Sequence, residues 1–576
     1  MHAGSSRECR SRSIDDESEP MADQESIPDM IVRNGRVFTG DRGLETPPVE
    51  AFSVAAGRFA VVGSDADVMA TAGPGTEVVD LEGRMTMPGI ADVHAHLMLG
   101  GAADAWELGI KPSDSLDDIL ASVRREASSA EAGEWIIGGI VGSLVMNQID
   151  NGRHLRALDD ASAGRPVMLR DDTQHNRWVN SAALQRMGVG ADTPDLPGGT
   201  YVRDDSGALT GVLYELASRH AEEVATSQLR DLAHRKRVSA RRAVEIMNSF
   251  GVTAVQEAAT FRTALEAFHQ LDHADELNAW IVASMPARDF VVDVGEVGDE
   301  LFDLAEQFRS THLRPDFVKA VVDGIPMSYT AALLEPYAGS HCHGKSYAGT
   351  SYFSMPELTA LLENCHDRGL GCKLHATGDG AVRQILDAVD AVRGSRGPGP
   401  VIHIAHTEFV HPQDIPRFAA LGVVADLSPA MWFPSPMSEA IRAVVPAAMM
   451  DRMWPFRDML ADNVMLAAGS DWPCAHPTPS PWVGLEAMIT RADPSGEFAG
   501  TLNAGQSIAL EAALQTYTSL PAAAMGLAAE TGTITVGKSA DFLVLDRDLM
   551  KVDSSSIHDT VVDRTVFAGR TVFSRS

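Results

Sequence analysis

MPGIADVHAH, at residues 87–96, is the stretch that decides the fold, because it ends in two histidines separated by one residue. Side chains alternate across a β-strand, so His94 and His96 point to the same side. A glycine-rich loop at residues 99–101 follows the pair. The pattern therefore predicts a strand that carries two imidazoles at its end, where they could share one metal ion.

Seven further apolar runs are typical of buried strands, and helix-like segments such as residues 357–368 and 381–393 separate them. With the stretch that ends at His94, they make eight strands. Eight buried strands alternating with helices predict an α/β fold built on a (β/α)8 TIM-like barrel. The seven runs cover residues 252–257, 279–284, 317–323, 371–375, 401–406, 423–427 and 464–471.

The two ends of the chain carry short β-like segments, too few at either end to bury both faces alone. We expect residues 30–83 and 530–576 to pair into one small composite β-sandwich. The barrel then takes residues 84–99 and 246–529. Residues 100–245 are far too many for one crossover and predict an inserted α+β subdomain that contributes to the pocket. Residues 1–29 are polar and charged, which predicts a disordered tail.

The composition argues against several classes of protein. A net charge of −32 over 576 residues disfavours nucleic acid or an anionic membrane as a partner. No apolar run is long enough to span a membrane, and the N-terminus lacks the apolar core of a signal peptide. Five cysteines without a Cys-x-x-Cys pair favour a reducing compartment. We therefore expect a cytoplasmic protein, with a homodimer as the default assembly.

Metal-ligating types of side chain occur on or directly after five of the eight predicted strands. The carboxyl ends of barrel strands meet around one face, where active sites lie. Imidazole and carboxylate groups suit zinc and other divalent metals. We expect six residues to converge on a centre of one or two ions: His94, His96, Lys319, His375, His406 and Asp471.

Taken singly, these residues have structural alternatives. His375 and His406 could be ordinary core histidines, and His403, three residues before His406, competes with it as a candidate. Asp471 could cap the segment that follows it. Lys319 lies inside an apolar run, where an unpaired ammonium is costly, so it must have a partner or lose its charge.

These motifs resemble the amidohydrolase superfamily over most of the chain from about residue 30. Residues 88–96 (PGIADVHAH) resemble its first-strand signature, and residues 537–542 (GKSADF) resemble its C-terminal turn. Four further motifs resemble the branch of N-substituted formamide deformylase and YtcJ-like proteins, amidohydrolase family 3. They are HNRWVNSAAL at 175–184, DG at 323–324 followed by TAA at 330–332, HATGD at 375–379 and GSDWP at 469–473.

The resemblance implies that the four histidines and Asp471 bind metal, most simply zinc. Lys319 matches a lysine that superfamily members can carboxylate to bridge two metals, and a carbamate would also resolve the burial of its ammonium. Two positions depart from the branch. Ala405 stands where the branch usually has glutamate, which leaves the support of His406 open, and Gly380 stands where it often has arginine.

The implied function is hydrolysis of a non-peptide C–N bond by metal-activated hydroxide, with an N-acyl or N-formyl amine as the small-molecule substrate. Asp471 would accept the proton of the water and deliver it to the departing amine. Hydrolysis of a cyclic amide, ester or lactone at the same site is the alternative. A non-enzymatic scaffold would predict gaps among the six positions, and none is missing.

Candidate substrate contacts lie in the predicted insert and near the end of the barrel. His175 is one by resemblance. Asp172 and Trp178 are others, although local capping and packing would explain them equally well. Arg491 could bind an acidic group of the substrate or pair with nearby carboxylates, and Glu215 is a further candidate ligand or pocket acid.

Overall fold

The computed structural model describes residues 27–41, 49–129, 131, 133–149, 151–172, 174–289, 294–338, 344–474 and 476–575. Residues 1–26 of the predicted tail lie outside this part of the chain. Across the described residues, no helix combines the length and the apolar character needed to cross a bilayer.

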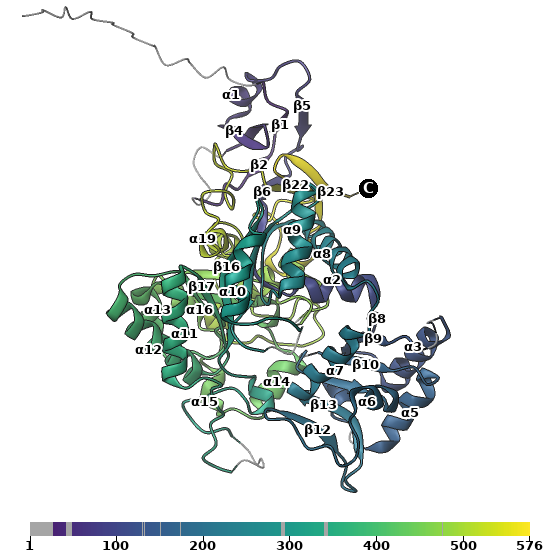
Figure 1. The fold of residues 1–576 in the computed structure, drawn as a ribbon. Helices are drawn as coiled ribbons and strands as arrows, with labels where there is room; N and C mark the ends of the chain where they lie inside the picture. Colours follow the sequence, from purple (N-terminus) through teal and green to yellow (C-terminus); the bar gives the residue numbers. More distant parts are fainter. Residues whose placement is uncertain are drawn as a thin grey trace, which may run out of the picture.

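The centre of the molecule is an eight-stranded parallel sheet within the described residues, which confirms the predicted barrel (Figure 1). Each predicted run overlaps one of its strands. Helices α11 (Met355–Arg368) and α12 (Asp379–Arg396) cover the sheet where helices were expected. In sheet order the strands are β7 (Ile90–Ala95), β14 (Val252–Glu257), β15 (Trp280–Pro286), β16 (Leu313–Val321), β17 (Gly371–Ala376), β18 (Ile402–His406), β19 (Val423–Leu427) and β20 (Leu466–Ala468).

Backbone hydrogen bonds between the end of β7 and the residues just beyond β20 close the barrel. The N–H of Asp471 donates to the carbonyl oxygen of His94 at 2.7 Å, and the N–H of His96 donates to that of Trp472 at 2.7 Å. Gly469 makes this approach feasible, because a Cβ atom there would lie 2.6 Å from the backbone nitrogen of His94. The closure therefore brings the last predicted ligand beside the first two.

Apolar side chains from alternate positions on several strands form a cluster inside the barrel. Trp280 and Val282 on β15, Phe317 on β16 and Val424 on β19 belong to it, and Phe567 from the C-terminal region joins it. Alternation along a strand sends such residues to one face. The cluster fills part of the barrel interior, and the polar residues come near the opposite, carboxyl ends of the strands.

Both ends of the chain contribute to two sheets that pack together next to the barrel (Figure 1). Strand β6 (Met85–Pro88) pairs with β21 (Phe542–Leu545), and the rings of Phe52 and Phe542 join the two sheets with centroids 4.9 Å apart. One sheet has the order β4 (Arg58–Gly63), β3 (Ala51–Ala55), β1 (Met30–Arg33) and β5 (Glu77–Asp80). The other has β2 (Arg36–Val37), β6, β21, β22 (Val562–Phe567) and β23 (Arg570–Ser574).

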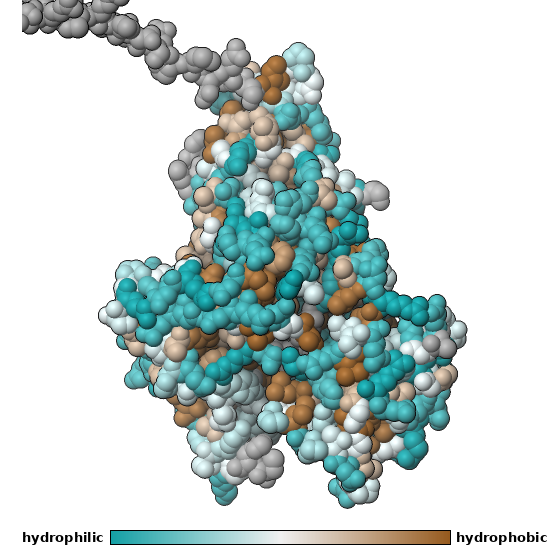
Figure 2. All heavy atoms as spheres, in the orientation of Figure 1, coloured by the Kyte–Doolittle hydropathy of each residue, from teal (hydrophilic) through white to brown (hydrophobic). Residues whose placement is uncertain are grey.

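The segment between β7 and β14 contains a separate mixed sheet with helices on both faces, at the lower right of Figure 1. Figure 2 shows mainly hydrophilic side chains over the outer helices on this face, with hydrophobic ones gathered where this segment meets the barrel. Its helices include α3 (Leu116–Ser129), α5 (Gly152–Ser162), α6 (Ser181–Met187) and α7 (Leu216–Ser227). The strand order is β12 (Gly199–Arg203), β13 (Leu209–Glu215), β11 (Asn176–Val179), β10 (Val167–Asp171), β9 (Ile136–Val141) and β8 (Leu108–Gly109).

Candidate active site

All six predicted ligands line one cavity at the carboxyl ends of the barrel strands, with an empty volume of about 940 Å³ that includes its open mouth. None of the six residues is more than 9% exposed. The structure therefore brings these positions together, although they are distant in the sequence. They are His94, His96, Lys319, His375, His406 and Asp471.

Three of the six form a compact group of potential ligand atoms. The Nε2 atoms of His94 and His96 lie 3.7 Å and 3.6 Å from Oδ1 of Asp471. One ligand atom from each residue lies within 4.8 Å of the other two. Two imidazole nitrogens and a carboxylate oxygen are a donor set that suits zinc. The residues present therefore fit the divalent metal that the resemblance implies.

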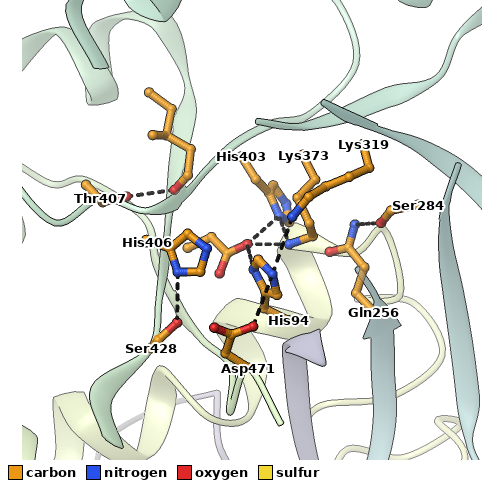
Figure 3. A network of polar contacts seen from close by, with 12 residues as sticks. His94, Gln256, Ser284, Lys319, Lys373, His403, His406, Thr407, Ser428 and Asp471 are labelled. Carbon is orange, nitrogen blue, oxygen red and sulfur yellow. Dashed lines mark hydrogen bonds and ion pairs between the residues drawn. The ribbon is translucent and has the colours of Figure 1, made fainter. Parts of the chain in front are cut away.

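The other three candidates surround this group. The ring of His406 lies 4.9 Å from that of His94 and 4.7 Å from that of His375, measured between centroids. The Nζ atom of Lys319 lies 3.5 Å from Nε2 of His94 (Figure 3). His406, His375 and Lys319 therefore offer ligand atoms in addition to those of the three-residue group. A second metal ion would need such additional ligands.

Burial keeps the imidazoles neutral. It lowers the pKa of His96 to about 3, and the ammonium groups of Lys319 and Lys373 add to the effect. The pKa of His94 is lowered well below its usual value for the same reasons. A neutral imidazole presents a free lone pair, so these residues can bind a metal without first losing a proton.

Burial also shifts the pKa values of Asp471 and Lys319 in the direction that favours their neutral forms. It raises the pKa of Asp471 to about 7, although the Lys319 ammonium opposes the shift. Burial and then the Lys373 ammonium lower the pKa of Lys319 to about 8. A carboxyl group whose pKa lies near neutrality is suited to accept and return a proton.

A charged group deeper in the barrel orients His94. The Nδ1 atom of His94 lies 3.3 Å from Oδ2 of Asp426, which also forms an ion pair with Lys373 (Figure 3). The Nζ atom of Lys373 lies 3.4 Å from Nδ1 of His403, whose Nε2 contacts the carbonyl oxygen of Ala524 at 3.0 Å. His403 is thus part of this deeper group and does not line the cavity, whereas His406 does.

Sequence reasoning missed Asp426 and Lys373, although each is a charged residue inside an apolar strand. Asp426 is the register partner of Ala405, the position where the branch usually has glutamate. A carboxylate is therefore present on the neighbouring strand. It contacts His94, while Nδ1 of His406 lies 3.4 Å from the hydroxyl of Ser428. Outer contacts of this kind fix the tautomer and orientation of a ligating histidine.

Asp426→Asn is expected to weaken the binding of a divalent metal such as zinc about 10- to 100-fold, because the substitution removes the charge that orients His94. Competition with a chromophoric chelator measures the dissociation constant. Asp541→Asn is the matched control, since Asp541 is an equally buried carboxylate that accepts a hydrogen bond from Trp280 away from the cavity. Equal zinc affinity in the two folded variants would exclude the orienting role.

The structure places only two of the four predicted substrate contacts at the cavity. Asp172 and His175 line it, and Nδ1 of His175 lies 3.1 Å from Oε2 of Glu215. Trp178 is fully buried in an apolar cluster of the insert, since both faces of β11 are covered. Arg491 is also fully buried after α17 (Pro481–Thr490), and its Nε donates to the carbonyl oxygen of Leu502 at 2.8 Å. The structure therefore places neither Trp178 nor Arg491 at the cavity.

The cavity has further lining residues that the sequence patterns did not reveal. Gln174, Thr377 and Glu408 supply polar atoms, and the apolar side chains come from several loops and short helices. No strand periodicity marks such positions. The apolar lining includes Ile325, Met327, Met431, Met437, Ile441 and Trp454.

A family model and a sequence relative both assign this chain to the amidohydrolases. A family model described as "Amidohydrolase family" matches residues 77–573. The N-substituted formamide deformylase of Arthrobacter pascens is 28% identical over 552 residues, which cover 94% of this chain and 97% of the relative. These findings confirm the resemblance that the motifs suggested.

Solved structures show the same fold. An uncharacterized metal-dependent hydrolase from Pyrococcus horikoshii OT3 superposes with a TM-score of 0.71 at 21% identity, over 91% of this chain and 99% of that one. A second from Pyrococcus furiosus gives 0.69 at 22% identity, over 91% and 100%.

Proposed function

Because this chain belongs to the amidohydrolase family and is a hydrolase of carbon–nitrogen bonds, we propose that it hydrolyses an N-acyl amine, most simply an N-formyl amine, and that zinc is its metal. The observation that carries the proposal is the group of His94, His96 and Asp471, whose ligand atoms lie within 4.8 Å of one another in a buried cavity. The name of the Arthrobacter pascens relative supports a formamide as the substrate.

His94, His96 and Asp471 would hold the first zinc ion, and His375, His406 and Lys319 would complete the centre. A bound divalent ion supplies a water with a pKa lowered to about 7 and polarises a carbonyl oxygen. We propose that Lys319 is carboxylated. The modification would convert a buried ammonium into an anion that neighbouring cations stabilise, and burial already disfavours the protonated amine.

Asp471 would accept a proton during attack on the carbonyl carbon and deliver it to the amine nitrogen as the C–N bond breaks. An amine leaves readily only when protonated, so this second transfer matters as much as the first. The neutral imidazoles would hold the ligand geometry without competing for the proton.

A panel of small substrates tests the proposal. Purified protein loaded with zinc is incubated with N-formyl and N-acetyl amines, simple lactones and esters, and the released amine or acid is measured. We expect the formamides to react fastest. Preferential hydrolysis of lactones or esters would replace amide hydrolysis with the alternative chemistry, and no turnover of any formamide or acetamide would refute the proposed substrate.

A further inference from the structure

The chain turns unusually at the end of the sixth barrel strand. His406 and Thr407 have φ values of 70° and 44°, both in the left-handed region. This region is costly for a β-branched residue such as threonine, and strain of this kind gathers at functional sites. The Thr407 hydroxyl donates to the carbonyl oxygen of Ile404 at 2.7 Å (Figure 3). The residue that follows this turn, Glu408, lines the cavity.

The buried carboxyl group of Glu408 has one oxygen that no hydrogen-bond donor reaches within the described residues. The residue is 7% exposed, and among the described residues no donor reaches its Oε1 atom. Its titratable neighbours are Asp323 and Tyr337. The Asp323 carboxylate accepts hydrogen bonds from three backbone N–H groups at 2.9–3.0 Å, and the Tyr337 hydroxyl donates to a backbone carbonyl. An acceptor buried without a donor is unfavourable, so the site calls for a ligand that supplies one.

The surroundings of Glu408 show which part of a substrate could reach it. The lining includes the proposed metal ligands and also apolar side chains such as Met431, Met437 and Ile441. The backbone N–H of Trp454 donates to the carbonyl oxygen of Glu408 at 2.8 Å and fixes its position. An apolar chain attached to the cleaved amide would follow this wall. A substrate that left the carboxyl group unpaired would be rejected strongly.

We propose that Glu408 determines specificity by accepting a hydrogen bond from the part of the substrate that projects away from the cleaved amide. This inference rests on the proposed function and names its substrate class. The substrates are N-formyl or N-acyl derivatives of amines that carry a second N–H or O–H donor, as in a diamine or an amino alcohol. A carboxyl group keeps an acceptor oxygen whether or not it carries a proton, so the role holds in both states.

Three formamides of equal chain length test the proposal. They are monoformyl cadaverine, the formamide of the matching amino alcohol, and N-hexylformamide, which has a methyl group in place of the donor. We expect the wild-type enzyme to prefer the better donor substrate over N-hexylformamide about 10- to 100-fold in kcat/KM, chiefly through KM. The ratio of kcat/KM between the first two substrates shows whether the enzyme prefers an ammonium or a hydroxyl group as the donor.

Two variants assign this preference to Glu408. Glu408→Met should abolish it, whereas Glu408→Gln, which keeps an acceptor oxygen, should retain a preference for the hydroxyl substrate. Glu439→Met is the matched control, because Glu439 is exposed on the neighbouring helix α14 (Pro436–Arg442) and pairs with Arg442. An unchanged preference in folded Glu408→Met would overturn the inference while leaving formamide hydrolysis intact.

Calorimetry with the free amines separates this inference from the proposed function and requires neither turnover nor a variant. Zinc-loaded wild-type protein should bind cadaverine or the amino alcohol at least tenfold more tightly than hexylamine. Such binding in a protein that hydrolyses no formamide would refute the proposed substrate but support the role of Glu408. Equal binding of all three amines would overturn that role.

Discussion

The Asp471→Asn enzyme is expected to retain its metal but to lose about 10²- to 10⁴-fold in kcat. The amide oxygen of asparagine can occupy the same ligand position beside His94 and His96, so metal binding should survive. The amide cannot accept and return a proton near neutral pH, so both proton transfers should fail. Steady-state kinetics on the most reactive formamide, together with elemental analysis for zinc, measure the two effects separately.

Asp414→Asn provides the matched control for this substitution. Asp414 is 2% exposed and pairs with Arg383 and Arg417 on the outer layer of the barrel, away from the cavity. It therefore reports what the loss of a buried carboxylate does to the fold alone. Near-normal kcat in the metal-loaded Asp471→Asn enzyme would refute the assignment of Asp471 as the proton carrier.

Removal of the metal is expected to abolish turnover, and added zinc should restore it. Prolonged dialysis against a chelator followed by titration with zinc provides the measurement. The apo protein should also unfold at a lower temperature, since a ligand that binds only the folded state stabilises it by about 2.7 kcal/mol at about 100 times its Kd.

The number of protons released when zinc binds to the metal-free protein gives this experiment a second readout. Burial keeps His94 and His96 neutral, so rebinding of zinc at neutral pH should release few protons from these rings. Isothermal titration in buffers of different ionisation enthalpy measures the number released. Full turnover in protein shown to contain no metal would refute the metal-dependent reaction.

The barrel and the cluster of six residues were predictable because they follow from local pattern. Alternation along β7 sends His94 and His96 to one side, and parallel strands carry their carboxyl ends to one face. The exact strand bounds were less predictable. The run at residues 464–471 contains only three strand residues, since Gly469 and the left-handed Asp471 end β20 early.

The predictions that required tertiary contacts were weaker. Trp178 does not reach the cavity, because it belongs to a strand with both faces covered. His175, three residues earlier in the same motif, does line the cavity. Arg491 is held in the interior by a backbone acceptor, the carbonyl oxygen of Leu502, which lies twelve residues beyond the end of its helix. Asp426 and Glu408 acquire their surroundings from a neighbouring strand and a strained turn, neither of which is visible in a one-dimensional pattern.

The pairing of β6 with β21 has a consequence for biosynthesis. Strand β6 is made early and leads directly into the strand that carries His94, yet its antiparallel partner begins at Phe542. On the ribosome, the edge of β6 at Met85 and Met87 therefore stays unpaired until residues 542–545 have been made. Strand β21 completes the support beneath the strand that carries His94 and His96, so a chain that stops before Phe542 would leave this strand poorly anchored.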